Sequence, residues 1–355
     1  MAKKVLVINP GSTSTKISIY LDEVVLLEKK IIHPTELIQK YRTIAEQYDF
    51  RKQMILDFLY ESKFDLTSLD AVCGRGGILR PLASGTYLIN EKMVNELLYN
   101  PRGEHASNLG SILAWEIAKP LKIPAFTVDP VVVDEMAPIA RISGMPIIER
   151  RSTFHALNHK AIARKAAKDL NIAYSELNMI VVHLGGGVSV GAHYKGRVID
   201  VNDALEGDGP MSPERSGTVP LGPLYRMCFS GKYTLEEITK MNHGKGGLVA
   251  YLGSNDAREI VKRIEGNDEY SKLIYEAMIY QIAKEIGACA TIFYGKVDAI
   301  ILTGGMAQEP YLVKELTNRV SFIAKVLVYP GEDEMLSLAQ GALRVLNKQE
   351  SPQIY

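Results

Sequence analysis

KVLVINPGSTSTKISIY, residues 4–20, places an apolar run, a polar loop and an alternating apolar segment one after another. The run has the composition of a buried strand, and residues 16–20 alternate apolar and polar side chains with the period of two of a strand. The loop lacks the second glycine of a Walker loop, and a strand pattern rather than a helix pattern follows it. We therefore predict a β-hairpin whose tip, residues 11–15, presents backbone N–H groups and hydroxyls to a phosphate.

A second copy of this plan begins near the middle of the chain, at residues 178–203, NMIVVHLGGGVSVGAHYKGRVIDVND. Here a strand pattern, a loop of three glycines and two further strand patterns follow each other. A third glycine turn, at 304–305, ends the apolar run AIILT. Two hairpin units that each open one half predict a duplicated two-domain α/β architecture. Three glycine turns after three buried strands suit a nucleotide held between two lobes.

Helical spacing of apolar residues occupies most of the chain between these units. The segments with this spacing are 34–48, 51–62, 152–170, 254–264, 268–295 and 332–348. The last begins with acidic residues, which helix N-termini favour. We expect this helix to pack back on the first domain. The predicted domains are therefore residues 1–150 together with 332–355, and residues 151–331.

The composition narrows the class of protein. The 355 residues include 41 basic and 41 acidic ones, and this balance argues against a nucleic-acid binder. The three cysteines form no CxxC pair, so neither a zinc site nor a disulfide framework is indicated, and we expect a cytoplasmic protein. No apolar stretch approaches the length of a membrane span, so no membrane partner is expected.

Specific motifs, in order along the chain, carry a resemblance to a known family. They are Asn9-Pro10-Gly11-Ser12-Thr13-Ser14-Thr15-Lys16, Phe154-His155-Ala156-Leu157-Asn158-His159, His183-Leu184-Gly185-Gly186-Gly187, Arg215-Ser216-Gly217 and Gly304-Gly305-Met306. The hairpin units resemble the superfamily of actin, the chaperone ATPases and the sugar kinases. The motifs resemble its acetate kinase family and, within that family, the butyrate kinases. The resemblance implies an actin-like ATPase fold with ribonuclease H-like halves and an interdomain nucleotide cleft.

The resemblance also implies the roles of individual residues. Catalytic roles fall on Arg215, His155, Asp129 and Arg75. ATP or ADP would be bound by Asn9, Gly11, Ser12, Thr13, Ser14, Thr15, Lys16, His183, Gly185, Gly186, Gly187, Gly304, Gly305 and Met306. The acyl pocket would contain Gly74, Phe154, Ala204 and Glu206, and Mg²⁺ would be bound by one of Glu332, Asp333 and Glu334. A homodimer or higher homo-oligomer is expected.

Two departures from the family pattern concern the acyl group. The family motif RVVHGG becomes VCGRGG at residues 72–77, so Arg75 is inferred to supply the positive charge from a shifted position. The second valine of that motif falls on Gly74, and the proline of the family segment PLEG becomes Ala204. Both changes remove side-chain volume, and we therefore expect a pocket that takes butyrate or a branched analogue.

The chemistry of the acceptor supports an acyl kinase over other kinases. A carboxylate has a pKa of about 4, is ionised at neutral pH and needs no general base, but it needs cations beside it. A sugar or glycerol kinase, the first alternative, would need a base aspartate. An actin-like or chaperone-like ATPase without acyl transfer is the second alternative.

His155 and His159 lie four residues apart, which places both on one face of a helix.

Overall fold

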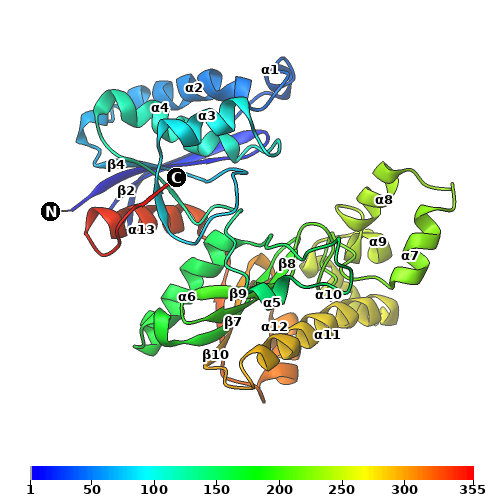
Figure 1. Cartoon of the computed structure of the whole chain (residues 1–355). Helices are drawn as coiled ribbons and strands as arrows, with labels where there is room; N and C mark the ends of the chain where they lie inside the picture. Colours follow the sequence, from blue (N-terminus) through cyan, green and yellow to red (C-terminus); the bar gives the residue numbers. More distant parts are fainter. Residues whose placement is uncertain (1) are drawn as a thin grey trace. The chain divides into compact units, whose positions relative to one another are not determined.

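The computed structural model describes residues 2–355, which form two compact units (Figure 1). The first unit contains the residues up to Val133 together with Asp333–Tyr355, and the second contains Asp134–Glu332. The structure thus places the boundary between the two units after Val133, whereas the sequence predicts it after residue 150. Residues 134–150 group with the second unit because Glu135 Oε2 accepts hydrogen bonds from Lys160 Nζ at 2.5 Å and from the Val198 N–H at 2.9 Å.

The first unit is built on a seven-stranded sheet with the order β12-β5-β6-β4-β1-β2-β3. Its strands are β1 (Lys4–Pro10), β2 (Ser14–Leu21), β3 (Val24–Ile32), β4 (Ala71–Gly74), β5 (Thr86–Leu88), β6 (Ala125–Val128) and β12 (Gln353–Ile354). β1 and β2 pair antiparallel from Lys4 opposite Leu21 to Pro10 opposite Thr15, which confirms the predicted hairpin. β4 lies parallel to β1, and β6 lies parallel to β4.

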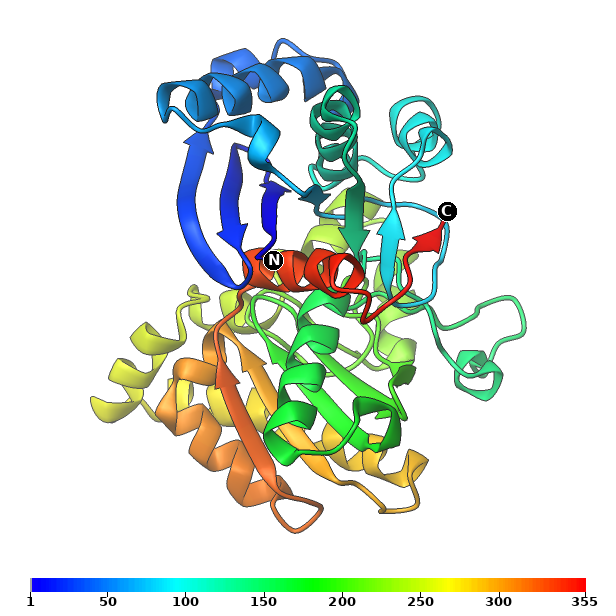
Figure 2. The same ribbon diagram turned by 90° about the vertical axis from the view of Figure 1, so that its left-hand side faces the viewer.

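Helices cover both faces of this sheet (Figure 2). They are α1 (Thr35–Ile38), α2 (Tyr48–Glu61), α3 (Glu91–Tyr99), α4 (Asn108–Leu121) and α13 (Glu334–Leu346), with 3-10 turns η1 (Ala45–Gln47) and η2 (Leu66–Ser68). α13 belongs to the first unit, as expected from the sequence. The single helix expected over 34–48 is wrong. Two of its backbone N–H groups, those of Arg42 and Ile44, bond to the carboxylates of Glu46 and Glu104 instead of to a helical turn.

The second unit is built on a five-stranded sheet with the order β11-β10-β7-β8-β9. Its strands are β7 (Asn178–Leu184), β8 (Val188–Tyr194), β9 (Arg197–Val201), β10 (Ala299–Gly304) and β11 (Val326–Pro330). Its helices are α5 (Pro138–Arg141), α6 (Ala156–Leu170), α7 (Leu221–Cys228), α8 (Leu235–Asn242), α9 (Gly247–Leu252), α10 (Ala257–Glu265), α11 (Glu269–Ile292) and α12 (Pro310–Val320), with turns η3 (Tyr174–Glu176) and η4 (Gly305–Gln308).

Side chains along β7 alternate between two buried layers. Ile180 and Val182 belong to the core that contains α11, whereas Met179 and Val181 belong to the core that contains α6. Both faces of β7 are therefore buried, as expected of a central strand flanked by helices. Among the described residues, no helix combines the length and apolar character needed to span a bilayer.

α4 lies unusually close to β4. A Cβ atom on Gly74 would overlap the carbonyl group of Gly110 in α4, and a Cβ on Gly110 would overlap the backbone of Arg75. Only glycine at both positions lets the two backbones touch. The expectation that Gly74 leaves open volume in an acyl pocket is therefore wrong, because the space beside it is filled by the backbone of α4.

The contact between α4 and β4 yields a stability prediction. Replacing Gly74 by valine should lower the free energy of unfolding by about 3 kcal/mol, since overpacking a rigid backbone contact forces the helix off the sheet. Urea unfolding followed by circular dichroism measures the change. Gly144→Val is the matched control, because nothing lies within 4 Å of a Cβ at that position. Equal unfolding midpoints for the two variants would contradict the assignment.

Candidate active site

In the first unit, candidate residues gather at one edge of the sheet. Asn9, Arg75 and Asp129 lie at or just after the carboxyl ends of β1, β4 and β6, and these three strands run parallel as neighbours. In open α/β sheets this edge is where ligands bind. The topology therefore places Asn9, which is predicted to bind the nucleotide, on the same edge as the predicted catalytic residues Arg75 and Asp129.

Arg75, Asn9 and Glu334 form one cluster at this edge. Arg75 Nη1 lies 2.8 Å from Glu334 Oε2 and 3.3 Å from Asn9 Oδ1, and the Asn9 side-chain amide donates to Glu334 Oε2 at 2.7 Å. All three side chains are partly exposed, so the cluster is accessible to a ligand. The shifted Arg75 therefore lies beside the first hairpin loop.

The three acidic candidates for the metal site have different surroundings. Glu334 belongs to the cluster just described. Asp333 accepts from the Leu336 N–H at 2.9 Å and caps α13. Glu332 belongs to the second unit, where its Oε1 lies 3.3 Å from His183 Nε2. Among residues 2–355, no group of three or more histidine, cysteine, aspartate or glutamate side chains is arranged to hold a metal ion.

The first hairpin loop is held from behind by a buried arginine. The Arg51 guanidinium donates to the carbonyls of Gly11 at 2.7 Å, Ser12 at 2.9 Å and Ser14 at 3.3 Å. Burial lowers the pKa of Arg51 to about 10, so the group stays charged at neutral pH. Because several loop carbonyls bind one cation, the loop has a fixed conformation.

The remaining loop residues divide into supporting and exposed groups. The Thr15 side chain is fully buried, and its hydroxyl bonds to His33 Nε2 at 2.8 Å. Thr15 thus supports the loop rather than offering a hydroxyl to a phosphate, which corrects the expectation from the sequence. Ser12 and Thr13 are exposed. Lys16 lies on β2 and forms an ion pair with Glu28 at 3.0 Å, so the structure directs its ammonium group toward β3.

Asp129 has a constrained backbone and a bound side chain. Its φ of 39° lies in the left-handed region that non-glycine residues rarely adopt. One carboxylate oxygen accepts from the Ser84 hydroxyl at 2.6 Å and from the Gly85 N–H at 2.8 Å. The carboxylate is therefore tied to the turn that precedes β5.

In the second unit, the loop at 212–216 lies over the glycine loop at 185–187. The Ser212 hydroxyl and the Glu214 N–H both donate to the Gly186 carbonyl, at 2.7 and 3.2 Å. The Arg215 guanidinium lies against Gly187, where a Cβ atom would overlap it. Gly187 therefore makes room for the arginine, and the two predicted site elements are in contact.

Arg215 carries a donor that the protein leaves unused. Its Nη1 donates to the Ala204 carbonyl, and its buried Nε has no hydrogen-bond partner among residues 2–355. Burial lowers the pKa of Arg215. A buried, unpaired N–H is costly unless a ligand or water completes it. This arrangement suits an anion beside Arg215.

His155 and His183 form the centre of the second group. Their rings stack with centroids 3.7 Å apart. The sequence suggested that His155 and His159 share one face of a helix. In the structure His155 precedes α6 as its N-cap residue, so it is not part of that helix. His183 Nδ1 bonds to Asn158 Oδ1 at 2.8 Å, and burial holds the pKa of His183 well below its usual range. His183 is therefore uncharged at neutral pH.

A cavity of about 790 Å³ opens beside these groups. It is lined by glycines of both loops, by η4 and by α10, with Gly185, Gly186, Gly305, Met306, Asn255, Arg258 and Glu332 among the residues. Gly304 has a φ of 92° and lies so close to Leu184 that a side chain could not be accommodated. The cavity is large enough for a nucleoside, since small-molecule sites span roughly 300–1,000 Å³.

Among the acyl candidates of the second unit, Ala204 lies next to Arg215. The Ala204 N–H donates to the Thr153 carbonyl at 2.9 Å, which brings residue 204 alongside Phe154. Phe154 is buried and packs edge-on against His159 with centroids 5.1 Å apart. Glu206 is exposed, and its carbonyl accepts from the Asn242 amide at 2.7 Å.

Sequence reasoning missed several residues that the structure brings into the site. Arg51 looked like an ordinary helix residue, and Arg258 was left out although it lines the cavity. Ser189 and His193 were read only as strand residues, yet both bond to the histidines. The alternation of Ser189, Gly191 and His193 on one face of a buried strand was the available signal.

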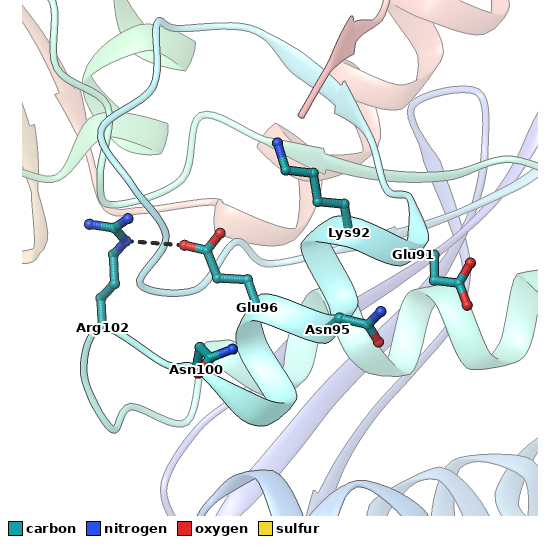
Figure 3. Close-up of a pocket in the computed structure, with 6 residues that line it drawn as sticks. All are labelled: Glu91, Lys92, Asn95, Glu96, Asn100 and Arg102. Atoms are coloured by element: carbon teal, nitrogen blue, oxygen red, sulfur yellow. Dashed lines mark hydrogen bonds and ion pairs between the residues drawn. The ribbon is translucent and has the colours of Figure 1, made fainter.

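A second hollow lies on α3, and none of the candidate residues lines it. Its volume is about 670 Å³, and Figure 3 shows the side chains that line it. They are Glu91, Lys92, Asn95, Glu96, Asn100 and Arg102. Arg102 Nε donates to Glu96 Oε1 at 3.1 Å, so these two charges pair with each other. This hollow is not assigned to the active site.

Solved structures similar to this chain include acetate and propionate kinases and ROK family proteins. Acetate kinase from Porphyromonas gingivalis is 22% identical over 97% of this chain and 100% of its own, with a TM-score of 0.79. A propionate kinase from Francisella tularensis subsp. tularensis SCHU S4 is 22% identical over 96% and 98%, with a TM-score of 0.72. A ROK family protein from Streptococcus pneumoniae TIGR4, solved with sucrose, is 12% identical over 98% and 100%, with a TM-score of 0.54.

These likenesses confirm the two-domain actin-like ATPase fold that the sequence predicts. The family model described as the acetokinase family matches residues 145–351, which is more than half of the chain. The matched segment contains His155, His183, the three glycine-loop residues and Arg215. The chain therefore belongs to the acetokinase family.

Proposed function

We propose that this protein transfers the γ-phosphoryl group of ATP to the carboxylate of a short-chain fatty acid, with butyrate or a branched analogue as the preferred acceptor. The product is an acyl phosphate, and the reaction is reversible. The observation that carries the proposal is the half-buried Arg215, whose guanidinium lies against the glycine loop and whose buried Nε has no hydrogen-bond partner among the described residues. Membership in the acetokinase family supports the phosphotransferase chemistry with a carboxyl acceptor.

The charges of the site suit two anions that must approach each other. A carboxylate acceptor is ionised at neutral pH, so the site needs no general base but must offset repulsion from the phosphoryl oxygens. Arg215 offers a guanidinium N–H, and His155 offers a ring nitrogen. Arg75 offers a further guanidinium at the edge of the first sheet. Donors placed where charge develops lower the barrier of the transfer step.

The adenosine is proposed to occupy the 790 Å³ cavity of the second unit. Its lining contains Gly305 and Met306, which the resemblance assigns to nucleotide binding, together with Arg258. The exposed Ser12 and Thr13 of the first hairpin loop and the glycines at 185–187 are proposed to bind phosphate oxygens. Strand-end loops with free backbone N–H groups commonly do so.

Glu334 is proposed as the carboxylate that binds Mg²⁺. Mg²⁺ keeps several water molecules and takes only one or two protein carboxylates together with phosphate oxygens, so no cage of protein ligands is required. Glu334 fits because its carboxylate lies at the phosphate hairpin with Asn9 and Arg75. When bound, the ion neutralises charge on the phosphate chain. Asp333 is already engaged as a helix cap.

We also propose a cytoplasmic location for this protein. Cys73, Cys228 and Cys289 are free thiols, which suits the reducing cytoplasm. The expected homo-oligomer stays a prediction.

A hydroxamate assay with ATP, Mg²⁺ and butyrate tests the reaction, and variants test the residues. Arg215→Ala and His155→Ala should each lower kcat by about a hundredfold, because each removes a donor that stabilises transition-state charge. KM for ATP should change less. Arg226→Ala, on the exposed side of α7, is the control. Full turnover in either site variant would remove that residue from the mechanism.

The same assay separates the alternatives. Phosphorylation of glucose or glycerol in place of butyrate would favour a sugar-type kinase. ATP hydrolysis without any acceptor dependence would favour an actin-like or chaperone-like ATPase. Either result would overturn the proposed function.

Ala204 provides a test of the acyl preference. A proline at this position would break the hydrogen bond from the Ala204 N–H to Thr153, so Ala204→Val is the cleaner way to add volume. Ala204→Val should shift the ratio of kcat/KM from butyrate toward acetate by about tenfold, since two methylenes are worth about 0.8 kcal/mol each. Ala288→Val, on an exposed position of α11, is the control. An unchanged ratio would show that Ala204 does not line the acyl pocket.

A further inference from the structure

A chain of hydrogen bonds runs through the interior of the second unit and ends at His155. The Tyr174 hydroxyl lies 2.7 Å from His193 Nδ1, and His193 Nε2 lies 3.2 Å from His159 Nδ1. His159 Nε2 lies 2.8 Å from the Ser189 hydroxyl, which lies 3.0 Å from His155 Nδ1. Three side chains, those of His193, His159 and Ser189, therefore connect the half-buried Tyr174 to the candidate catalytic histidine.

The architecture of β8 creates this chain. Ser189 and His193 stand four residues apart on one face of the strand, with Gly191 between them. A Cβ atom on Gly191 would lie only 3.2 Å from His159 Nδ1, so the glycine leaves room for that ring between the two neighbours. Ser189, His159 and His193 are fully buried, so the protein itself supplies these hydrogen bonds.

With the buried Ser189 hydroxyl donating to one of its two histidine partners and accepting from the other, the protons in the chain can be arranged in two ways. Burial holds the pKa values of His159 and His193 well below the usual range, so both rings are neutral and each carries one N–H. Each bond needs one donor and one acceptor. Either every ring is protonated on Nε2 and the bonds point from Tyr174 toward His155, or every ring is protonated on Nδ1 and they point the opposite way.

The Tyr174 end favours the first arrangement. A phenol is a stronger acid than a neutral imidazole N–H, and an imidazole nitrogen is a better acceptor than a phenol oxygen. The 2.7 Å separation is typical of a hydroxyl donor. Lys160 and Arg164 place positive charge near His193, and Lys160 is paired with Glu135. In the first arrangement the protons are shifted away from Tyr174, so the electronegative end of the chain faces this positive charge.

We propose that Ser189, His159, His193 and Tyr174 are positioning residues that keep His155 protonated on Nε2, through a hydrogen-bond chain donated inward from Tyr174. The Nε2–H of a neutral His155 then donates to a phosphoryl oxygen. A fixed neutral donor places no charge against the stacked, uncharged ring of His183. This role of His155 rests on the proposed function, whereas the direction of the chain does not.

Nitrogen NMR of protein labelled with ¹⁵N-histidine tests the direction without any activity assay. Two-bond proton–nitrogen correlations distinguish the two neutral tautomers of a histidine ring. We expect the Nε2–H form for His155, His159 and His193 in the unmodified protein. The Nδ1–H form as the main species in any of the three rings would overturn the proposal.

Kinetics of a double-mutant cycle test whether Tyr174 acts through the chain. Tyr174→Phe removes the outer donor and lets water bond to His193 in either direction, so the Nδ1–H form should become populated at His155. We expect kcat to fall about three- to fivefold, the equivalent of one hydrogen bond, with KM for ATP and butyrate nearly unchanged. Ser189→Ala cuts the chain beside His155 and should lower kcat by at least as much.

The combined variant separates the chain from a general structural effect. In the Ser189→Ala background, Tyr174→Phe should cause no further loss of kcat, because the connection is already broken. Multiplied losses, or wild-type kcat and tautomers in Tyr174→Phe, would overturn the proposal. Tyr329→Phe is the matched control, since its hydroxyl donates to Asp169 at 2.8 Å outside the chain. If the unmodified protein lacks acyl kinase activity, the proposed function fails, and the tautomers still decide the direction of the chain.

Discussion

Close approach of backbone and side-chain groups at glycine residues is the constraint on which both units depend. In the first unit α4 reaches β4 only because Gly74 and Gly110 lack side chains. In the second unit the absence of a side chain at Gly187 lets the Arg215 guanidinium lie on the glycine loop, and Gly191 admits His159 to β8. The same property thus serves packing in one place and the assembly of polar groups in another. Glycine motifs in this chain are therefore not all phosphate loops.

Buried polar side chains then fix the geometry that the glycines permit. Arg51 binds the carbonyls of the first hairpin loop, and Lys160 binds Glu135 in the interior of the second unit. An uncompensated charge or amide in such a place would be costly, so each of these contacts is made with matched partners. Rigid loops of this kind suit phosphoryl transfer, in which positioning of the groups carries most of the catalysis.

The sequence predicted the parts that depend on local pattern. The hairpin at residues 4–20 and its copy at 178–203 followed from strand periodicity, and both are present. The sequence could not predict contacts that depend on tertiary distance. The sequence suggested that Gly74 enlarges an acyl pocket, but the backbone of α4 occupies the space beside it. Thr15 looked like a phosphate ligand, yet Arg51, from a helix 36 residues away, binds its hydroxyl from the interior.

The order in which the chain is made has a consequence for the first unit. Its sheet includes β12, and α13 covers one of its faces, but both elements belong to residues 333–355. The second unit is continuous in sequence, from 134 to 332. During synthesis the second unit can therefore complete its core while the ribosome is still adding residues that the first unit needs. Until then, the side chain of Val128 that Gly341 later covers stays open, so the nascent first unit exposes apolar surface that the finished chain buries.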